Sequence, residues 1–290
     1  MAIRQTAGNA AERAAGQPVL QLLERVGYVA RGALYVVVGV LALKVATSSA
    51  GGKATDLTGA LVFLIGNQFG KFVLIVMVVG LAAYAVWGLI RAIFDPLHRG
   101  SDASGLMARL GFVTSAVSYG AIALFGLKLL MGTGSAATGD ATQKTAASLL
   151  AHPFGGQLTI LVGIIAIGIG IGQFVEAYRA KFKNDLKGTE MSQAQEKVVV
   201  GLGRYGMAAR GVTFLVIGYF LIQAGIYKTA SLAHGFGGAL VFLLNQPYGH
   251  LLLAIVALGF VALGIHSILC ARWMRLMDTS HAASSRAITA

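Results

Sequence analysis

The segment "ERVGYVARGALYVVVGVLAL", residues 24–43, places two arginines at the start of a long apolar run. A closely similar segment, "GRYGMAARGVTFLVIGYFLI", occupies residues 203–222. An apolar run of about 20 residues is long enough for a helix to cross the hydrocarbon core of a bilayer. The two segments therefore indicate membrane-spanning helices and an internal repeat.

Composition places the whole chain in the membrane class. Of its 290 residues, 56% are hydrophobic and 12% are charged, and the mean hydropathy is +0.74, whereas soluble domains carry roughly a quarter charged residues. Apolar stretches of spanning length lie near residues 27–46, 72–94, 110–131, 157–178, 205–226 and 250–271. They are continuous rather than alternating, which indicates helices. We expect an all-α polytopic membrane protein with six transmembrane helices.

Basic residues predict the orientation of these helices. If the chain crosses the membrane six times, 17 of its 23 lysines and arginines lie on the side of the two termini. The positive-inside rule then places both termini in the cytoplasm. Residues 1–18 lack the apolar core of a signal peptide. We attribute the net charge of +12 to contact with anionic lipids rather than to nucleic-acid binding.

Self-alignment of the chain gives three copies of one unit, each a helix, an outer loop with a short apolar element, and a second helix. The first helices align without gaps at Arg25/Arg109/Arg204, Gly27/Gly111/Gly206, Arg31/Ser115/Arg210 and Tyr35/Tyr119/Phe214. Each copy has an even number of spans, so the repeats are parallel and a pseudo-threefold arrangement is expected. The apolar segments at 58–70 and 237–249 are too short to span and predict interfacial or re-entrant helices.

These copies give the expected organisation of the chain. Residues 1–19 form an N-terminal arm, 20–99 the first repeat, 100–180 the second, 181–200 a charged linker, 201–275 the third repeat and 276–290 the tail. The "GYxARGxxY" opening, the three copies and the "NQPYG" turn resemble the bacterial membrane family called domain of unknown function 1206, over residues 20–273. This resemblance implies repeated two-helix units in a bacterial inner membrane, and it implies no mechanism. The second copy departs from the pattern, with Ser115 in place of arginine.

Two sets of arginines are candidates for binding. Arg25, Arg109 and Arg204 lie at the helix starts and predict contacts with lipid headgroups. Arg31 and Arg210 lie about 9 Å deeper, six residues at 1.5 Å each. At that depth an arginine usually faces the bundle interior. It either binds an anion such as a phosphate, a carboxylate or a lipid head, or pairs with a carbonyl at a helix end.

Helix residues 157–178 add two polar candidates, Gln173 and Glu176. A carboxylate inside a membrane span is often functional. Arg179 and Lys183 follow Glu176 at i+3 and i+7, so a local ion pair is the simpler interpretation. Gln173 lies one turn earlier and can line the same face.

The search for catalytic and cofactor motifs is negative. The sequence has no GxSxG motif, no Walker lysine loop and no HExxH motif, and we expect no Cys–His pair. We therefore expect no enzyme, no cofactor and no metal. Of the six histidines, His266 lies well inside a span, and no partner for haem ligation is evident.

Two classes of function fit these observations. A binder or transporter of a small anion or lipid predicts a polar centre lined by Arg31, Arg210, Gln173 and Glu176. A non-catalytic accessory or scaffold protein predicts a dry, glycine-packed centre, outward-facing arginines and a membrane protein partner. The deep arginines in matching repeats favour the first class.

Overall fold

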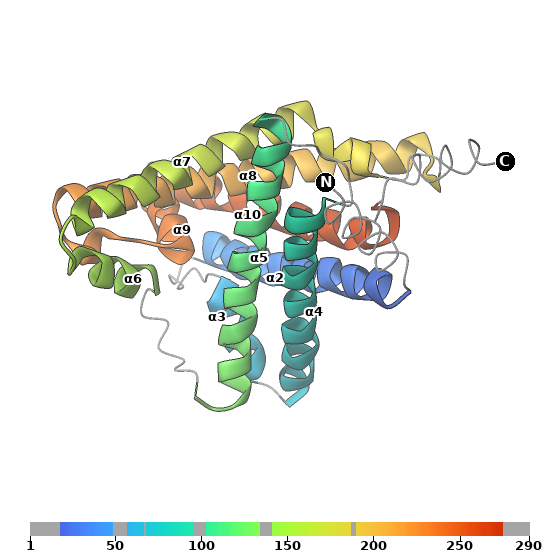
Figure 1. The fold of residues 1–290 in the computed structure, drawn as a ribbon, viewed down its shortest axis with the longest axis horizontal. Coiled ribbons are helices and arrows are strands. Elements are labelled where there is room, and N and C mark those ends of the chain that lie inside the picture. The colour runs from blue at the N-terminus through green and yellow to red at the C-terminus, as the bar shows by residue number, and fades with distance from the viewer. Residues whose placement is uncertain are drawn as a thin grey trace, which may run out of the picture.

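The computed structural model describes residues 18–48, 57–66, 68–95, 103–133, 141–186 and 190–274. Within these ranges, six helices are long and apolar enough to cross a membrane. They are α2 (Pro18–Thr47), α4 (Gln68–Phe94), α5 (Ala103–Leu130), α7 (Gly155–Arg179), α8 (Gln193–Ile226) and α10 (Gly249–Trp273) (Figure 1). The expected all-α class with six spanning helices is confirmed.

Helix α8 begins earlier than the sequence indicated. The expected linker at 181–200 contains a 3-10 helix, η1 (Lys181–Asp185), followed by the first two turns of α8. Ser192 starts α8 with a capping box, because its hydroxyl accepts from the Gln195 N–H and the Gln195 side chain accepts from the Ser192 N–H. The 34 residues of α8 extend about 51 Å at 1.5 Å per residue. This exceeds the ~30 Å apolar core.

Each repeat carries a short helix before its second spanning helix. These are α3 (Leu57–Ile65), α6 (Ala141–Leu150) and α9 (Phe236–Leu244), the last preceded by η3 (Ala230–Leu232). Phe154 and Tyr248, which end two of the following turns, have left-handed backbone φ angles of 65° and 59°. A Cβ on the next residue, Gly155 or Gly249, would overlap a carbonyl oxygen of the short helix, as would one on Gly70 in the first copy. The repeated aromatic–glycine sequence is therefore explained by the tight turn.

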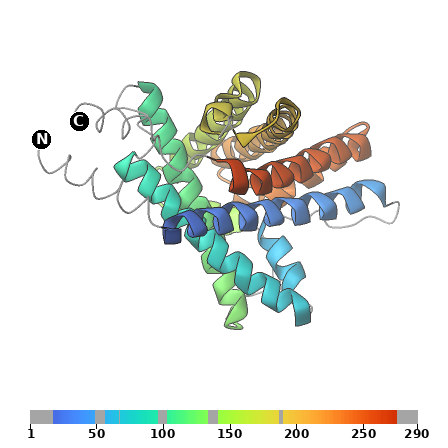
Figure 2. The same cartoon turned by 90° about the vertical axis from the view of Figure 1, so that its right-hand side faces the viewer.

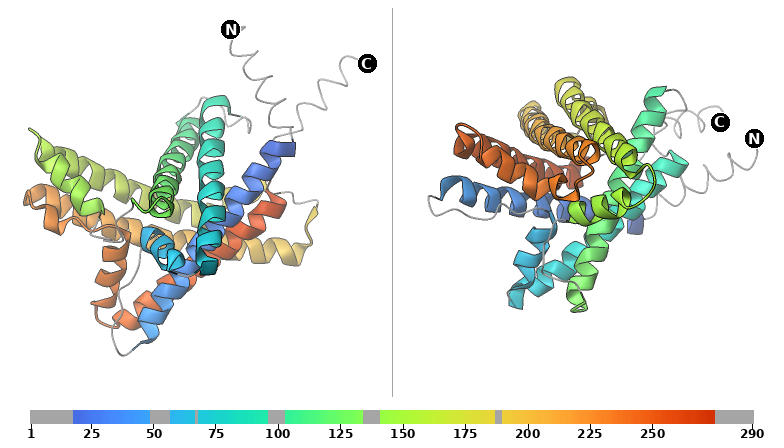
Figure 3. Two further views of the ribbon diagram at one scale, coloured as in Figure 1. Left: turned by 90° about the horizontal axis from the view of Figure 1, so that it is seen from below. Right: turned by 90° about the vertical axis from the view of Figure 1, so that its left-hand side faces the viewer.

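The spanning helices associate as three antiparallel pairs, and each pair joins neighbouring repeats. Helix α4 packs on α5, α7 on α8, and α10 on α2, and the pairs cross one another (Figures 1 and 3). Glycines bring two of these pairs close. A Cβ on Gly32 would lie 2.6 Å from the Gly264 carbonyl oxygen, and one on Gly218 would lie 2.7 Å from that of Gly163. Such small-residue contacts are typical of membrane helix pairs.

The pairing of the last spanning helix with the first brings the two ends of the fold together. The start of α2 lies beside the end of α10 (Figure 2). Between them, Glu24 and Arg25 line a small cavity with Cys270 and Met274. The three parallel repeats therefore form a ring rather than a row.

Within a repeat, the two spanning helices pack closely in the first and third copies but not in the second. Helix α2 packs on α4, and α8 packs on α10. Helices α5 and α7 lack a comparable contact in the described part of the chain. The ring consequently has five packed seams and one loose seam, which lies between the helices of the second repeat.

Candidate functional site

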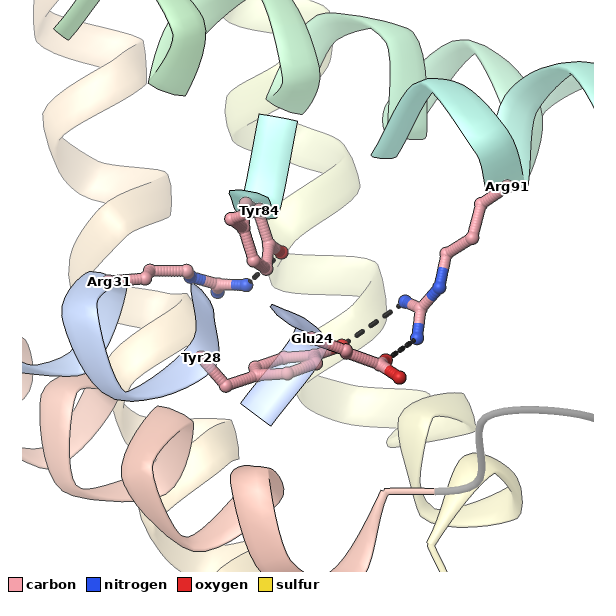
Figure 4. A network of polar contacts seen from close by, with 5 residues as sticks. All are labelled: Glu24, Tyr28, Arg31, Tyr84 and Arg91. Atoms are coloured by element: carbon pink, nitrogen blue, oxygen red, sulfur yellow. Dashed lines mark hydrogen bonds and ion pairs between the residues drawn. The ribbon is translucent and has the colours of Figure 1, made fainter. Parts of the chain in front are cut away.

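Arg31 occupies the centre of the bundle, two turns inside the spanning part of α2. Its Nη1 donates to the Tyr84 hydroxyl at 2.5 Å. Its guanidinium lies 5.3–5.9 Å from the ring centroids of Tyr35, Tyr84 and Tyr119. Its Nε is buried and has no hydrogen-bond partner within the described residues. Figure 4 shows the side chain reaching from α2 toward Tyr84 on α4.

The aligned positions of the three first helices meet at this centre. The Tyr35 and Tyr119 hydroxyls are hydrogen-bonded to each other at 2.8 Å, although α2 and α5 belong to different repeats. In the third repeat, Phe214 takes the same position, and the Arg210 guanidinium lies 5.4 Å from its ring. Arg31, Tyr35, Tyr119 and Arg210, which occupy two aligned positions of the three first helices, therefore lie near one another.

The centre carries a net positive charge. Arg210 lies within electrostatic range of Arg31, Tyr35 and Tyr119. Within the described ranges, no carboxylate forms an ion pair with either arginine. Both arginines keep part of their surface accessible despite their depth. Like charges repel, and aromatic faces offset only part of the cost of a buried cation.

Arg91, near the end of α4, differs from Arg31 and Arg210 because it has a carboxylate partner. It is almost fully buried and forms an ion pair with Glu24 of α2 at 2.5 Å (Figure 4). Its Nη1 donates to the Tyr28 hydroxyl at 3.1 Å. This pair is not evident from the sequence, because Glu24 precedes the expected first span and Arg91 belongs to the basic residues that indicate topology. The signal for this pair in the sequence is Glu24 itself, a single acidic residue at the start of an apolar helix.

The arginines at the helix starts donate to neighbouring helix ends. Arg109 donates from Nε to the Ala92 carbonyl at 2.7 Å and from Nη2 to that of Ile93 at 3.1 Å. Arg204 donates to the Tyr178 carbonyl at 3.2 Å. Tyr178 aligns with Ile93, so the same contact occurs at two junctions between repeats. Arg25 lies at the third junction, beside the end of α10. Headgroup contact by these arginines stays a prediction.

Gln173 and Glu176 are not joined to the central arginines. Glu176 accepts from the Phe182 backbone N–H at 2.9 Å. The simpler interpretation proposed an ion pair of Glu176 with Arg179 or Lys183. Among the described residues Glu176 has neither ion pair, and Lys183 instead pairs with Glu196 at 2.8 Å. That difference follows from the start of α8, which brings Glu196 over η1. Gln173 is half-buried on α7. Their role in binding stays a prediction.

One pair of groups corrects the motif search. Cys270 Sγ lies 3.5 Å from His266 Nε2, one helical turn apart on α10. His266 Nδ1 lies 2.9 Å from the Val199 carbonyl oxygen, so this nitrogen donates and Nε2 is left as an acceptor for the thiol. A Cys–His pair is therefore present, although Cys270 is only 1% exposed. Among the described residues, no group of three or more His, Cys, Asp or Glu side chains is arranged to hold a metal ion.

Two surface hollows lie away from the arginines. One, of about 290 Å³, is lined by residues of α6, α7 and α8, among them Thr145, Thr159 and Leu221. The other, of about 320 Å³, lies between the start of α8 and the end of α10, beside Val198 and Trp273. Their linings are mostly apolar, so neither matches the chemistry of the central cluster.

Fold and site together define an integral membrane protein of three parallel two-helix repeats around a cluster of arginines and tyrosines. The family described as Domain of Unknown Function (DUF1206) matches residues 26–95, 110–180 and 205–274, and the chain belongs to it. The resemblance found in the sequence motifs is thereby confirmed. The chain is 35% identical over 253 residues to "Uncharacterized protein YxxB" of Bacillus subtilis (strain 168), covering 87% of this chain and 90% of that protein. No solved structure matches.

Proposed function

We propose that this membrane protein binds a small anionic group between Arg31 and Arg210, and that it holds or transports the ligand there. The observation that carries the proposal is the pair of deep arginines without a carboxylate partner in the described part of the chain. A phosphate or carboxylate would supply the missing negative charge and accept from the free Arg31 Nε.

The energetics favour a ligand over a purely structural role. An arginine at the centre of a membrane helix costs at least about 2.5–3.5 kcal/mol, and one that lies two helical turns inside a span costs part of this. A cation–π contact returns roughly 0.5–2 kcal/mol. The repulsion between the Arg31 and Arg210 charges adds to this cost. Arg91 shows how the same chain neutralises a structural arginine, namely with a buried glutamate.

The tyrosines supply further donors to the site. In the Tyr35–Tyr119 pair one hydroxyl donates to the other, which leaves one O–H free to donate to a ligand. The Tyr84 hydroxyl accepts from Arg31 and keeps its own proton for donation. Two hydroxyl O–H groups and the Arg31 Nε–H group of this cluster are therefore left to donate to an anion.

The distribution of basic residues supports an orientation for this site. The arginines at the helix starts lie on the side that carries most of the lysines and arginines. The positive-inside rule makes that side cytoplasmic, with both termini there, in a bacterial inner membrane. The site then lies about two helical turns below the cytoplasmic surface.

The test is binding of inorganic phosphate to the purified full chain in detergent, measured by isothermal titration. We expect the wild type to bind phosphate and Arg31→Gln/Arg210→Gln to lose affinity at least about tenfold, because each lost charged hydrogen bond contributes about 1.5–3 kcal/mol. Arg109→Gln/Arg204→Gln is the matched control, since it removes two arginines that have carbonyl partners.

Equal phosphate affinity in the wild type and the central double variant would contradict the assignment of Arg31 and Arg210. A wild-type protein that does not bind phosphate, and instead co-purifies in fixed ratio with a membrane protein, would contradict the anion site and support the scaffold role.

A further inference from the structure

The seam between the two helices of a repeat is closed by a glycine on the first helix in repeats one and three. A Cβ on Gly27 of α2 would lie 2.9 Å from the Tyr84 Cβ on α4. At the aligned position of the third repeat, a Cβ on Gly206 of α8 would lie 2.5 Å from the Leu263 Cβ on α10. The same contact therefore closes both seams.

A second glycine, on the other helix, completes each closed seam. Gly80 of α4 lies against Ala30 of α2, and Gly259 of α10 lies against Ala209 of α8. The two seams thus share a Gly–Ala contact one turn from the first. Small residues at both levels let the helix backbones approach closely.

The second repeat lacks both contacts. Gly111, which aligns with Gly27 and Gly206, has no atom within 4 Å of where its Cβ would lie. Ile165 takes the position of Gly80 and Gly259, and it is 53% exposed. A branched side chain there prevents the close approach that glycine permits, so the sequence itself explains why α5 and α7 stay apart.

This open seam leads to the arginine centre. Ser115, one turn after Gly111 on α5, occupies the position that Arg31 and Arg210 hold in the other repeats. Its small side chain leaves part of the surface accessible there. One further turn along α5, the Tyr119 ring faces the Arg31 guanidinium at 5.7 Å. The loose seam and the missing arginine therefore lie on the same side of the cluster.

The outer part of the seam has the character of the bilayer core. Exposed apolar side chains on α5 and α7, such as Leu110, Val117 and Ile165, flank it. Apolar side chains make no favourable contact with a free inorganic anion, whereas they pack favourably against an acyl chain. The seam thus combines an apolar entrance with a cationic inner end.

We propose that the ligand is a lipid with an anionic phosphate headgroup that enters sideways from the bilayer between α5 and α7. Its phosphate binds Arg31 and Arg210, and its acyl chains stay in the seam. This proposal rests on the proposed anion site and adds the class of ligand and its route.

The experiment compares two probes in native mass spectrometry of the full chain in mild detergent: phosphatidylglycerol and inorganic phosphate. Gly111→Trp fills the open seam, and Gly201→Trp, at an exposed α8 glycine with equally open surroundings, is its matched control. We expect the wild type and Gly201→Trp to retain one phosphatidylglycerol. Gly111→Trp should retain roughly tenfold less while still binding inorganic phosphate.

A second variant closes the seam without a bulky side chain, so the test does not depend on Gly111→Trp folding correctly. Thr114 aligns with Ala30 and Ala209, so Thr114→Ala/Ile165→Gly gives the second repeat the Gly–Ala pair of the other two and should also lower phosphatidylglycerol retention. Arg31→Gln/Arg210→Gln should lose both probes.

The outcomes separate the two proposals. Undiminished phosphatidylglycerol in Gly111→Trp and in Thr114→Ala/Ile165→Gly would overturn lateral entry. Wild-type binding of inorganic phosphate without phosphatidylglycerol would overturn the lipid ligand and leave the anion site intact. Retention of neither probe would overturn the anion site itself.

Discussion

The first and second repeats share one plan and differ in charge and packing. In the first, a buried glutamate neutralises Arg91, and glycines close the seam between α2 and α4. In the second, Glu176 takes the position of Arg91, Ser115 that of Arg31, and the seam between α5 and α7 is loose. Pseudo-symmetric contacts between the repeats hold the ring together, and the second repeat departs from that symmetry at the seam between α5 and α7.

The largest contrast should come from the two carboxylates. Glu24→Gln leaves the Arg91 charge buried and uncompensated, so we expect a loss of about 3–5 kcal/mol in the free energy of unfolding. Glu176→Gln keeps an oxygen that can accept from the Phe182 N–H, and its cost should stay below about 1 kcal/mol. Titration with a denaturing detergent measures both. Glu24→Gln/Arg91→Gln should recover part of the loss, and equal costs for the two single variants would refute the contrast.

The aligned glycines test the difference in packing. Gly27→Leu and Gly206→Leu force a side chain into a closed seam and should each cost about 1–3 kcal/mol. Gly111→Leu enters open space and should be neutral or slightly stabilising, because glycine is about 1 kcal/mol worse than alanine in a helix. Thermal unfolding in detergent ranks the three variants. A Gly111→Leu protein as unstable as Gly27→Leu would show that the second seam is packed after all.

A smaller effect is expected from the hydroxyl pair that links the two repeats. Tyr119→Phe removes the hydrogen bond to Tyr35 and should cost about 1 kcal/mol. The third repeat already has Phe214 at this position, so the ring itself is accommodated. Tyr248→Phe, at a residue that is 84% exposed, is the control and should leave the thermal midpoint unchanged. The prediction fails if both variants behave alike.

The junction arginines should give the smallest effects. Arg109 makes two carbonyl contacts across the first junction, whereas Arg204 makes one across the second. Arg109→Gln should therefore cost up to about 1 kcal/mol, and Arg204→Gln less, since exposed charged contacts contribute little. The two thermal midpoints, compared at low and high salt, check this order. A larger shift for Arg204→Gln would contradict it.

Much of the fold was predictable because the membrane imposes it. The length of each apolar run fixes a spanning helix, and the gap-free match of Arg25, Arg109 and Arg204 fixes the repeat. The start of α8 was misplaced because charged residues such as Lys197 look like a linker, whereas the Ser192 capping box continues the helix outward. A hydropathy profile detects apolar segments that lie in lipid, so it does not detect the polar start of α8.

The site was predictable only where the repeat made it visible. Arg31 and Arg210 were found because they align, and in the structure they lie close enough for their charges to interact. The Glu24–Arg91 and His266–Cys270 contacts occur in single copies, so self-alignment does not reveal them. Gln173 and Glu176 were chosen for polarity inside a span. Polarity alone does not reveal their contacts, and Glu176 accepts from the Phe182 backbone N–H instead.

The pairing of α10 with α2 has a consequence for how the protein is made. Helix α2 is synthesised before the other spanning helices that the structure describes, yet the glycine face around Gly32 packs against Gly264 of α10, the last of them. During synthesis α2 therefore enters the bilayer without this neighbour and stays so until the four spanning helices between them and α10 itself have been translated. A chain that is truncated before α10 therefore leaves the small-residue face of α2 unpacked, which exposes it to membrane proteases.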